Sequence, residues 1–406
     1  MAEAAQFDVV IIGAGIAGGA LAVALSGQGL SIALVEAQPL ALIDLPQERD
    51  LTSFDPRVSA ITPRSQSHLE SMGVWNSISD YRQCPYQHMT VWDAEGTGRI
   101  DFDRSEVDAL CLGHIVENRA IVNSLLQHIK VASDVKTFPE TSVLDCKPLS
   151  PDSRMTVKLA DGTVLQSQLL VAADGARSHI RDLMDFKTRE WDYGHSAIVT
   201  TAEVEQSHKD TCWQRFLSSG PLAFLPLPGG DTQHFCSIVW SLKDELVDPL
   251  MQLSDAAFAK ELEKSIESCL GEVRACAKRF TFPLRQRHAV DYVQPGVALV
   301  ADAAHTIHPL AGQGINLGLQ DVVVLAEELL AGHKRGIKLG DLQLLKRYQR
   351  RRKGENLLMM AAMDGFKSLF EQESLSIRWL RNTGLRTVGQ LGPVKQQLIR
   401  HAMGLA

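Results

Sequence analysis

Apolar residues follow one another with little alternation in four segments of this chain. Such runs are typical of strands that are buried on both faces of a parallel sheet. The segments are Phe7–Ile12, Ser31–Val35, Gln168–Ala172 and Val297–Val300. Helical composition follows the first and the last of them, at Gly19–Ser26 and Ile315–Leu330. Strands that alternate with helices in this way predict an α/β fold built on a parallel sheet.

A different pattern in the middle of the chain indicates a second sheet. Short apolar segments separated by turn residues are typical of antiparallel strands. The segments with this pattern are Ala197–Val204, Leu222–Leu227 and Phe235–Leu242, together with the alternating stretch Tyr86–Phe102. We therefore expect a mainly antiparallel β-sheet, inserted into the α/β domain, that binds the substrate.

These patterns predict a discontinuous α/β domain, an inserted substrate domain and a helical C-terminal region. The expected boundaries are 1–75, 103–180 and 281–345 for the first, 76–102 and 181–280 for the second, and 346–406 for the third. Three further helices are expected, from Arg57 toward Met72, at Ile115–Ile129 and at Ser254–Ser268.

Closely spaced glycines follow the first predicted strand. This glycine loop comprises Gly13, Ala14, Gly15, Ile16, Ala17 and Gly18. In a G-x-G-x-x-G loop the first glycine permits a tight turn, the second lets the backbone approach a pyrophosphate, and the third lets helix and strand pack closely. Glu36 ends the next strand, where a carboxylate can accept hydrogen bonds from a ribose. Strand, glycines, helix, strand and acid together predict a Rossmann-like dinucleotide site.

Two other predicted strands end in an acid, Asp174 after the third and Asp302 after the fourth. Because the carboxyl ends of parallel strands meet at one edge, both acids and the glycine loop are expected to face one ligand. Beyond Asp302, a loop with Pro309, Gly312 and Gly314 leads into a helix whose N–H groups and dipole would stabilise negative charge. The alternative for this loop is an ordinary strand-to-helix connection in which glycines only turn the chain.

Three motifs together resemble one enzyme family. They are the glycine loop with Glu36, Asp174-Gly175, and Asp302-Ala303-Ala304-His305 followed by Pro309-Leu310-Ala311-Gly312-Gln313-Gly314-Ile315-Asn316. The chain is similar to the flavin-dependent aromatic hydroxylases of the para-hydroxybenzoate hydroxylase fold. Within them it resembles the ubiquinone-biosynthesis hydroxylases that act on polyprenylphenols, through stretches such as Gly113-His114-Ile115-Val116-Glu117-Asn118 and Phe224-Leu225-Pro226-Leu227. This likeness extends over nearly the whole chain.

The resemblance implies that FAD is the cofactor, and it assigns contacts to the motifs. The glycine loop would bind the pyrophosphate, Glu36 the adenosine ribose and Asp302 the ribitol chain, while Asp174 would serve both FAD and the nicotinamide donor. Further residues implied along FAD are Arg57, Arg119, Pro309, Gly312, Gln313, Gly314, Ile315 and Asn316. The family usually has glycine before the second acid, and this chain has Ala301, whose methyl group must be accommodated beside the cofactor.

The resemblance also implies a reaction. NAD(P)H would reduce FAD during a transient visit, because no second G-x-G-x-x-G follows a strand. O2 would then form a flavin hydroperoxide that hydroxylates the ring of a polyprenylated phenol. Two alternatives remain at this stage: an FAD-dependent dehydrogenase or reductase of the same fold, and a flavin-binding assembly subunit of the ubiquinone-synthesis complex.

Three side chains are candidates for proton transfer. His305 and His308 lie near the proposed flavin ring, and Tyr193 lies near the start of the inserted sheet. A structural role is the more common one for each of these residue types. Two neighbouring histidines also raise the question of a metal, but no carboxylate or thiol completes a ligand set, so no metal is expected.

Cysteine use and the N-terminal residues bear on the compartment. The seven cysteines include no C-x-x-C pair, which argues against a disulfide framework or a zinc site and favours a reducing compartment such as the cytoplasm. The apolar run Val9–Leu25 follows Glu3 and Asp8 rather than a basic flank. We therefore expect it to be neither a signal peptide nor a membrane span.

The C-terminal region is basic although the whole chain has a net charge of −7. From Leu345 to Ala406 there are 12 Lys or Arg and 4 Asp or Glu. An acidic body without a recognisable binding module argues against nucleic acid as a partner. The basic region with the apolar run Leu357–Met363 indicates a helix packed on its own domain. Its alternative is a surface for the inner membrane, for other ubiquinone-biosynthesis proteins or for a second copy of the chain.

Overall fold

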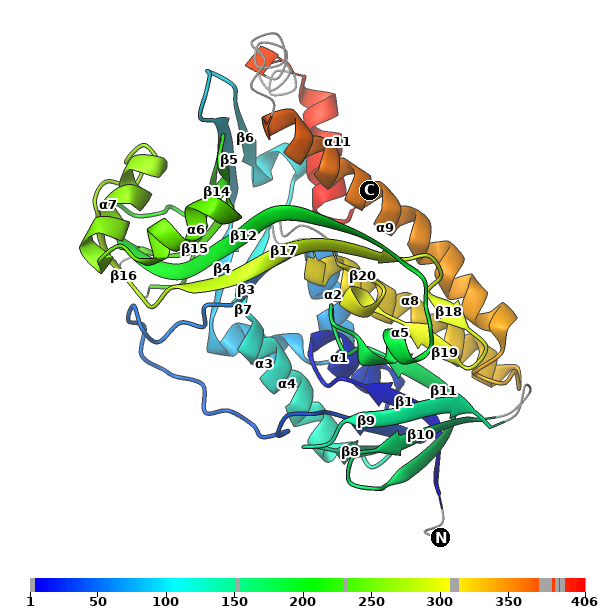
Figure 1. Ribbon diagram of the computed structural model, residues 1–406. Coiled ribbons are helices and arrows are strands. Elements are labelled where there is room, and N and C mark those ends of the chain that lie inside the picture. Colours follow the sequence, from blue (N-terminus) through cyan, green and yellow to red (C-terminus); the bar gives the residue numbers. More distant parts are fainter. Residues whose placement is uncertain are drawn as a thin grey trace.

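The computed structural model describes residues 4–149, 154–229, 233–306, 314–371, 382–383, 387 and 391–405. Within these residues the chain forms three sheets flanked by helices (Figure 1). The longer helices are α1 Ile16–Leu25, α2 Pro63–Ser71, α4 Asn118–Val131, α6 Asp244–Met251, α7 Asp255–Ser265, α8 Gly314–Lys334, α9 Leu342–Glu371 and α11 Gly392–Ala402. The shorter ones are α3 Trp75–Tyr81, η1 Arg104–Val107, α5 His179–Leu183 and η2 Ala301–Ala303.

The first sheet contains the predicted parallel strands, in the order β18-β19-β11-β1-β2-β8. Its parallel strands are β1 Ala5–Ile12, β2 Ile32–Val35, β8 Val135–Phe138, β11 Val164–Ala172 and β19 Val297–Leu299. Antiparallel strands complete it, namely β9 Val143–Pro148, β10 Met155–Leu159 and β18 Val293–Gln294. Helix α1 lies against α4 and α8, and the apolar strand residues form the main core.

The second sheet is mainly antiparallel, in the order β20-β17-β12-β15-β14-β13-β5-β6, with β16 paired to β12. Its strands are β5 His88–Asp93, β6 Arg99–Asp103, β12 Thr188–Val204, β13 Thr211–Leu217, β14 Gly220–Pro226, β15 Phe235–Lys243, β16 Val273–Cys276, β17 Phe280–Ala289 and β20 His305–Thr306. The long strands β12 and β17 cross above the first sheet in Figure 1. The chain passes from β19 of the first sheet to β20 of the second across Asp302, so this residue lies where the two sheets meet.

A third, small sheet corrects two helix predictions. It pairs β3 Val58–Ile61 and β4 Gln83–Tyr86 with the central strand β7 Gly113–Glu117. The helices expected from Arg57 and from Ile115 therefore begin later, at Pro63 and Asn118, because the apolar residues before them form buried strands. Thr62 caps α2 by accepting a hydrogen bond from the Ser65 N–H. The mixed α/β fold class is confirmed, whereas the domain boundaries remain a prediction.

Helix α9 supports the packed-helix interpretation of the basic region. It lies alongside α8 (Figure 1) and buries Leu344, Leu345 and Tyr348 in the main core. Part of its positive charge is neutralised, because Arg351 pairs with both Glu327 and Glu328 of α8. In the part of the chain that the structure describes, no helix is both long enough and apolar enough to cross a membrane.

Candidate functional site

Three neighbouring parallel strands end together, and each leads into a predicted site residue. Strand β11 lies between β1 and β19, and its Ala172 is level with Ile12 on one side and Leu299 on the other. The glycine loop follows β1, Asp174 follows β11 and Asp302 follows β19. The prediction that these segments share one edge of the sheet is therefore confirmed.

The three glycines of the loop have different surroundings. Gly13 has φ +97°, and a β-carbon on it would lie 2.5 Å from the Ala173 carbonyl oxygen. A β-carbon on Gly18 would lie 1.8 Å from the Gly13 carbonyl oxygen. These two glycines are needed for the packing of the loop itself. In contrast, apart from its chain neighbours, no atom of the described residues lies within 4 Å of a β-carbon on Gly15, so this position leaves space in which a ligand could approach the backbone.

The Glu36 carboxylate lies against the glycine loop rather than pointing into solvent. It accepts a hydrogen bond of 2.7 Å from the Ala14 N–H and one of 3.0 Å from the Gln38 N–H. The acid at the end of β2 is therefore held next to the loop after β1, as a ribose-binding acid requires.

Asp174 carries an acceptor that the protein does not use. One carboxylate oxygen accepts a hydrogen bond of 3.2 Å from the Ile180 N–H, while the other is buried and has no hydrogen-bond partner among the described residues. Such an atom is costly unless a ligand or water supplies a donor. Arg181, which sequence analysis missed, donates to the carbonyl oxygens of Ala176 and Ala303 and so ties the loop after β11 to η2.

Asp302 reaches solvent but is surrounded by much of the protein. Burial raises its pKa above the ordinary range, and nearby Asp321 adds to this, whereas the positive charges of His305 and Arg57 act in the opposite direction. The exposed guanidinium of Arg57 is thus close enough to influence Asp302. The Arg57 charge thus favours the ionised form of the Asp302 carboxyl.

Two other predicted cofactor residues are engaged with the protein. The Arg119 guanidinium lies 2.6 Å from a Glu117 carboxylate oxygen and donates to the Tyr81 hydroxyl at 3.2 Å. The Asn316 amide donates to the Ala60 carbonyl at 2.8 Å and accepts from the Thr62 N–H at 3.0 Å. Asn316 therefore fixes the start of α8, where Gly314 and Ile315 also lie, to the end of β3 and to Thr62, the N-cap residue of α2.

The candidates for proton transfer have separate surroundings. His305 is 2% exposed, and its Nε2 lies 2.5 Å from a carboxylate oxygen of fully buried Asp321, so this nitrogen is already engaged. Tyr193 belongs to β12, but its side chain is outside the description. His308 lies outside the described residues, as do Pro309, Gly312 and Gln313. Among the described residues, no group of three or more His, Cys, Asp or Glu could hold a metal ion.

Sequence analysis also missed Asp321. Its signal was a single acid in the stretch Leu317–Leu325, whose only other polar side chain is Gln320, one helical turn after Gly318.

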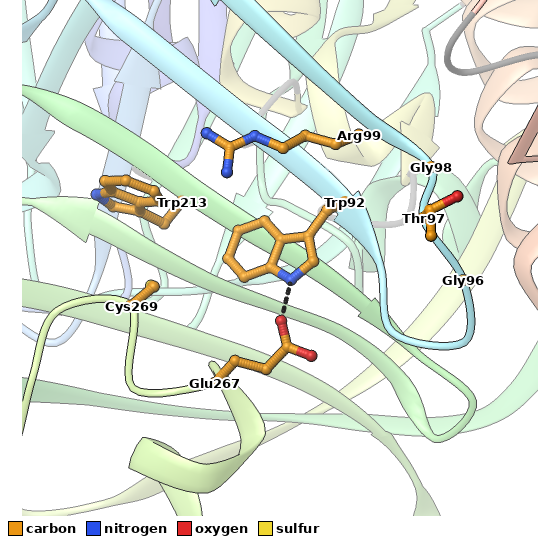
Figure 2. Close-up of a pocket in the computed structure, with 8 residues that line it drawn as sticks. All are labelled: Trp92, Gly96, Thr97, Gly98, Arg99, Trp213, Glu267 and Cys269. Atoms are coloured by element: carbon orange, nitrogen blue, oxygen red, sulfur yellow. Dashed lines mark hydrogen bonds between the residues drawn. The ribbon is translucent and has the colours of Figure 1, made fainter.

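A pocket of about 300 Å³ lies away from the strand ends, at the turn between β5 and β6. Figure 2 shows its lining residues, which are Trp92, Gly96, Thr97, Gly98, Arg99, Trp213, Glu267 and Cys269. The Trp92 indole N–H donates to a Glu267 carboxylate oxygen at 3.0 Å. None of the predicted site residues lines this pocket, so it is distinct from the candidate site.

Comparison with known families agrees with the geometry of the strand ends. The family described as FAD binding domain matches residues 6–361. The chain belongs to this family. This FAD-binding protein is 35% identical over 399 residues to 3-demethoxyubiquinol 3-hydroxylase of Escherichia coli (strain K12), with 98% of each chain covered. It is also 35% identical over 402 residues to ubiquinone hydroxylase UbiL of Rhodospirillum rubrum, with 98% of this chain and 89% of the relative covered.

A solved structure shows the same fold. The crystal structure of PqsL, a probable FAD-dependent monooxygenase from Pseudomonas aeruginosa, matches the FAD-binding protein with a TM-score of 0.76 at 22% identity, and 94% of this chain and 100% of that chain are covered. The predicted resemblance and the predicted FAD cofactor are confirmed.

Proposed function

We propose that this FAD-binding protein is a monooxygenase that hydroxylates the aromatic ring of a polyprenylated phenol in ubiquinone biosynthesis, with NAD(P)H as electron donor and O2 as oxidant. The observation that carries the proposal is the likeness, over 98% of the chain, to two hydroxylases named for ubiquinone chemistry. The convergence of the glycine loop, Asp174 and Asp302 at one sheet edge supports it.

The described residues fit FAD. The space beside Gly15 would accommodate a pyrophosphate, Glu36 would bind the adenosine ribose, and the Asp174 oxygen without a partner among the described residues would accept a hydrogen bond from the cofactor. Asp302 with Arg57 would hold the ribitol chain. When bound, FAD supplies the transfer of electrons from NAD(P)H to O2 and of one oxygen atom to the ring.

Helix α8 would provide the electrostatic part of the site. The first N–H groups of this 21-residue helix have no partner within the helix, and its dipole places partial positive charge at Gly314. Negative charge that develops beside this end would be stabilised. Asn316 holds the end in place through Ala60 and Thr62. The candidates for proton transfer are Tyr193, His308 and His305, and the Nε2 of His305 lies against the Asp321 carboxylate.

Helix α11 supports contact with an anionic membrane surface, from which a polyprenylated substrate would be taken. Its buried face places Ile399 and Met403 against Leu112. Another face is exposed and apolar, with residues three and four apart, namely Leu391, Val394 and Leu398. Exposed Arg400 and His401 add basic character, and α11 contains no acidic residue. An apolar stripe with basic neighbours suits binding to anionic lipid.

The proposed reaction is tested with the purified protein. An absorbance spectrum shows whether flavin is bound, and anaerobic NAD(P)H followed by O2 and a prenylated phenol shows whether reduction leads to hydroxylation. We expect the flavin band to bleach, to return and to leave a hydroxylated phenol. Bound flavin that is reduced but yields no such product, with the correct phenol and partner proteins supplied, would instead indicate a dehydrogenase or an assembly subunit.

A further inference from the structure

The Asp321 carboxylate has different partners on its two oxygens. One oxygen accepts a hydrogen bond from the Ala301 N–H at 3.1 Å and lies 2.5 Å from His305 Nε2. The other accepts from Arg352 Nε at 2.8 Å and from the Asn356 amide at 3.1 Å. The first pair of partners flanks Asp302 in the chain, and the second pair belongs to α9. A single side chain of α8 thus connects α9 to both sides of Asp302.

This cluster is enclosed to a degree that is unusual for charged groups. Asp321 and Asn356 are 0% exposed, Arg352 is 1% exposed and His305 is 2% exposed. Burial by itself would raise the pKa of Asp321, but the charges and hydrogen bonds of His305 and Arg352 outweigh it and lower the pKa. Buried ion pairs often give little net stability compared with apolar residues of similar size. The ion pairs of the cluster are therefore not sufficient to assign it a stabilising role.

The local backbone indicates what Asp321 holds. Ala301, the residue before Asp302, has φ +53°, a left-handed conformation that residues other than glycine rarely adopt. Its N–H is fixed by Asp321, and the ring of His305, three residues after Asp302, is fixed by the same oxygen. The turn that carries Asp302 is therefore clamped on both sides by one acceptor.

We propose that Asp321 is a positioning residue of the active site, which holds the Asp302 turn in the geometry that FAD requires through the oxygen that faces Ala301 and His305. This inference rests on the proposed function, because it assumes that FAD binds at Asp302. Asp321 does not contact the cofactor; it acts through the backbone of Ala301 and the ring of His305.

Two variants separate positioning from stability. Asp321→Asn keeps the shape of the side chain but has one acceptor oxygen, so it cannot serve both sets of donors. Arg352→Met breaks the same ion pair and leaves the Asp321 oxygen available to Ala301 and His305. We expect both variants to lower Tm. Asp321→Asn should in addition weaken FAD binding at least tenfold and lower the yield of hydroxylated phenol per NAD(P)H consumed at saturating FAD, whereas Arg352→Met should stay near wild type in both measurements below its Tm.

Two further variants complete the test. Asp321→Glu keeps the charge and is expected to fold, but it displaces both oxygens and should also lower the yield per NAD(P)H. Glu327→Gln removes a charge from an exposed ion pair between α8 and α9, with Arg351, and should leave FAD affinity and yield unchanged. The inference is overturned if Asp321→Asn and Arg352→Met lose FAD affinity and product yield in the same proportion to their loss of Tm. It is also overturned if Asp321→Glu gives the same product yield per NAD(P)H as wild type. A wild-type protein that binds FAD but forms no hydroxylated phenol would refute the proposed function, and FAD affinity in the same variants would still test the positioning role.

Discussion

A β-carbon on Gly318 would lie 2.8 Å from the methyl carbon of Ala301. Gly318 is in α8, and Ala301 is the residue that replaces the usual glycine before Asp302 in the resembling family. The missing side chain of Gly318 therefore provides the space that the methyl group of Ala301 occupies. The additional methyl group of Ala301 is thus directed toward α8 rather than toward the cofactor site.

The first prediction concerns this pair. Ala301→Gly should stabilise the apoprotein by about 0.5 to 1 kcal/mol, because relief of the left-handed conformation exceeds the added chain entropy of glycine. Gly318→Ala should destabilise it by about 1 to 3 kcal/mol, because the new methyl group overlaps that of Ala301. Thermal unfolding measures both. In the double variant most of the Gly318→Ala cost should disappear, and strictly additive changes would show that the two positions are not in contact as described.

The second prediction distinguishes the glycines of the loop. Gly15→Ala should change the free energy of unfolding of the apoprotein by less than about 1 kcal/mol, because the new methyl group meets no atom of the described residues beyond its chain neighbours. It should nevertheless weaken FAD binding, because the methyl group stands where the pyrophosphate approaches. Gly18→Ala is the matched comparison, and its overlap with the Gly13 carbonyl should destabilise the apoprotein itself. Titration with FAD and thermal unfolding of the apoproteins measure the two effects, and normal FAD affinity in Gly15→Ala would place the pyrophosphate elsewhere.

Sequence patterns predicted the part of the site that depends on local order along the chain. The apolar strands and the glycine spacing define the positions of Asp174 and Asp302, since parallel strands end at a common edge. The pairing of Asp321 with Arg352 could not be predicted, because it depends on how α9 packs on α8. Likewise, Ile115 lies in an apolar run that is compatible with either a helix or a strand. It forms a strand because it pairs with β3 and β4, which come from elsewhere in the chain.

The third prediction concerns pH. Burial, followed by the charges of His305, Lys353 and Arg189, lowers the pKa of His288 to about 4. The unfolded chain takes up this proton near pH 6.5, whereas the folded protein takes it up only near pH 4. The contribution of His288 to the free energy of unfolding is therefore fully present above pH 6.5. As the pH falls from 6.5 to 4, the free energy of unfolding decreases by about 1.4 kcal/mol per pH unit, and the total loss is about 3 kcal/mol. His288→Gln should flatten this part of the stability profile in urea unfolding of the apoprotein. Exposed His401→Gln is the control, and equal profiles for wild type and His288→Gln would contradict the assignment.

The last prediction concerns the C-terminal region. Deletion of residues 375–406 removes α11 and uncovers Leu112, but it leaves Asp321, Arg352 and Asn356 in place. We therefore expect the shortened protein to retain FAD while its self-association or its binding to anionic vesicles is lost. A chain that ends at Leu345 removes the core residue Tyr348 and nearly all of α9, so it should lose its stability and its flavin with it. The flavin spectrum, light scattering after gel filtration and cosedimentation with anionic or neutral vesicles measure these outcomes. If the 375–406 deletion loses its flavin but keeps its oligomeric state and vesicle binding, the assigned role of α11 is wrong, and this segment supports the cofactor site instead.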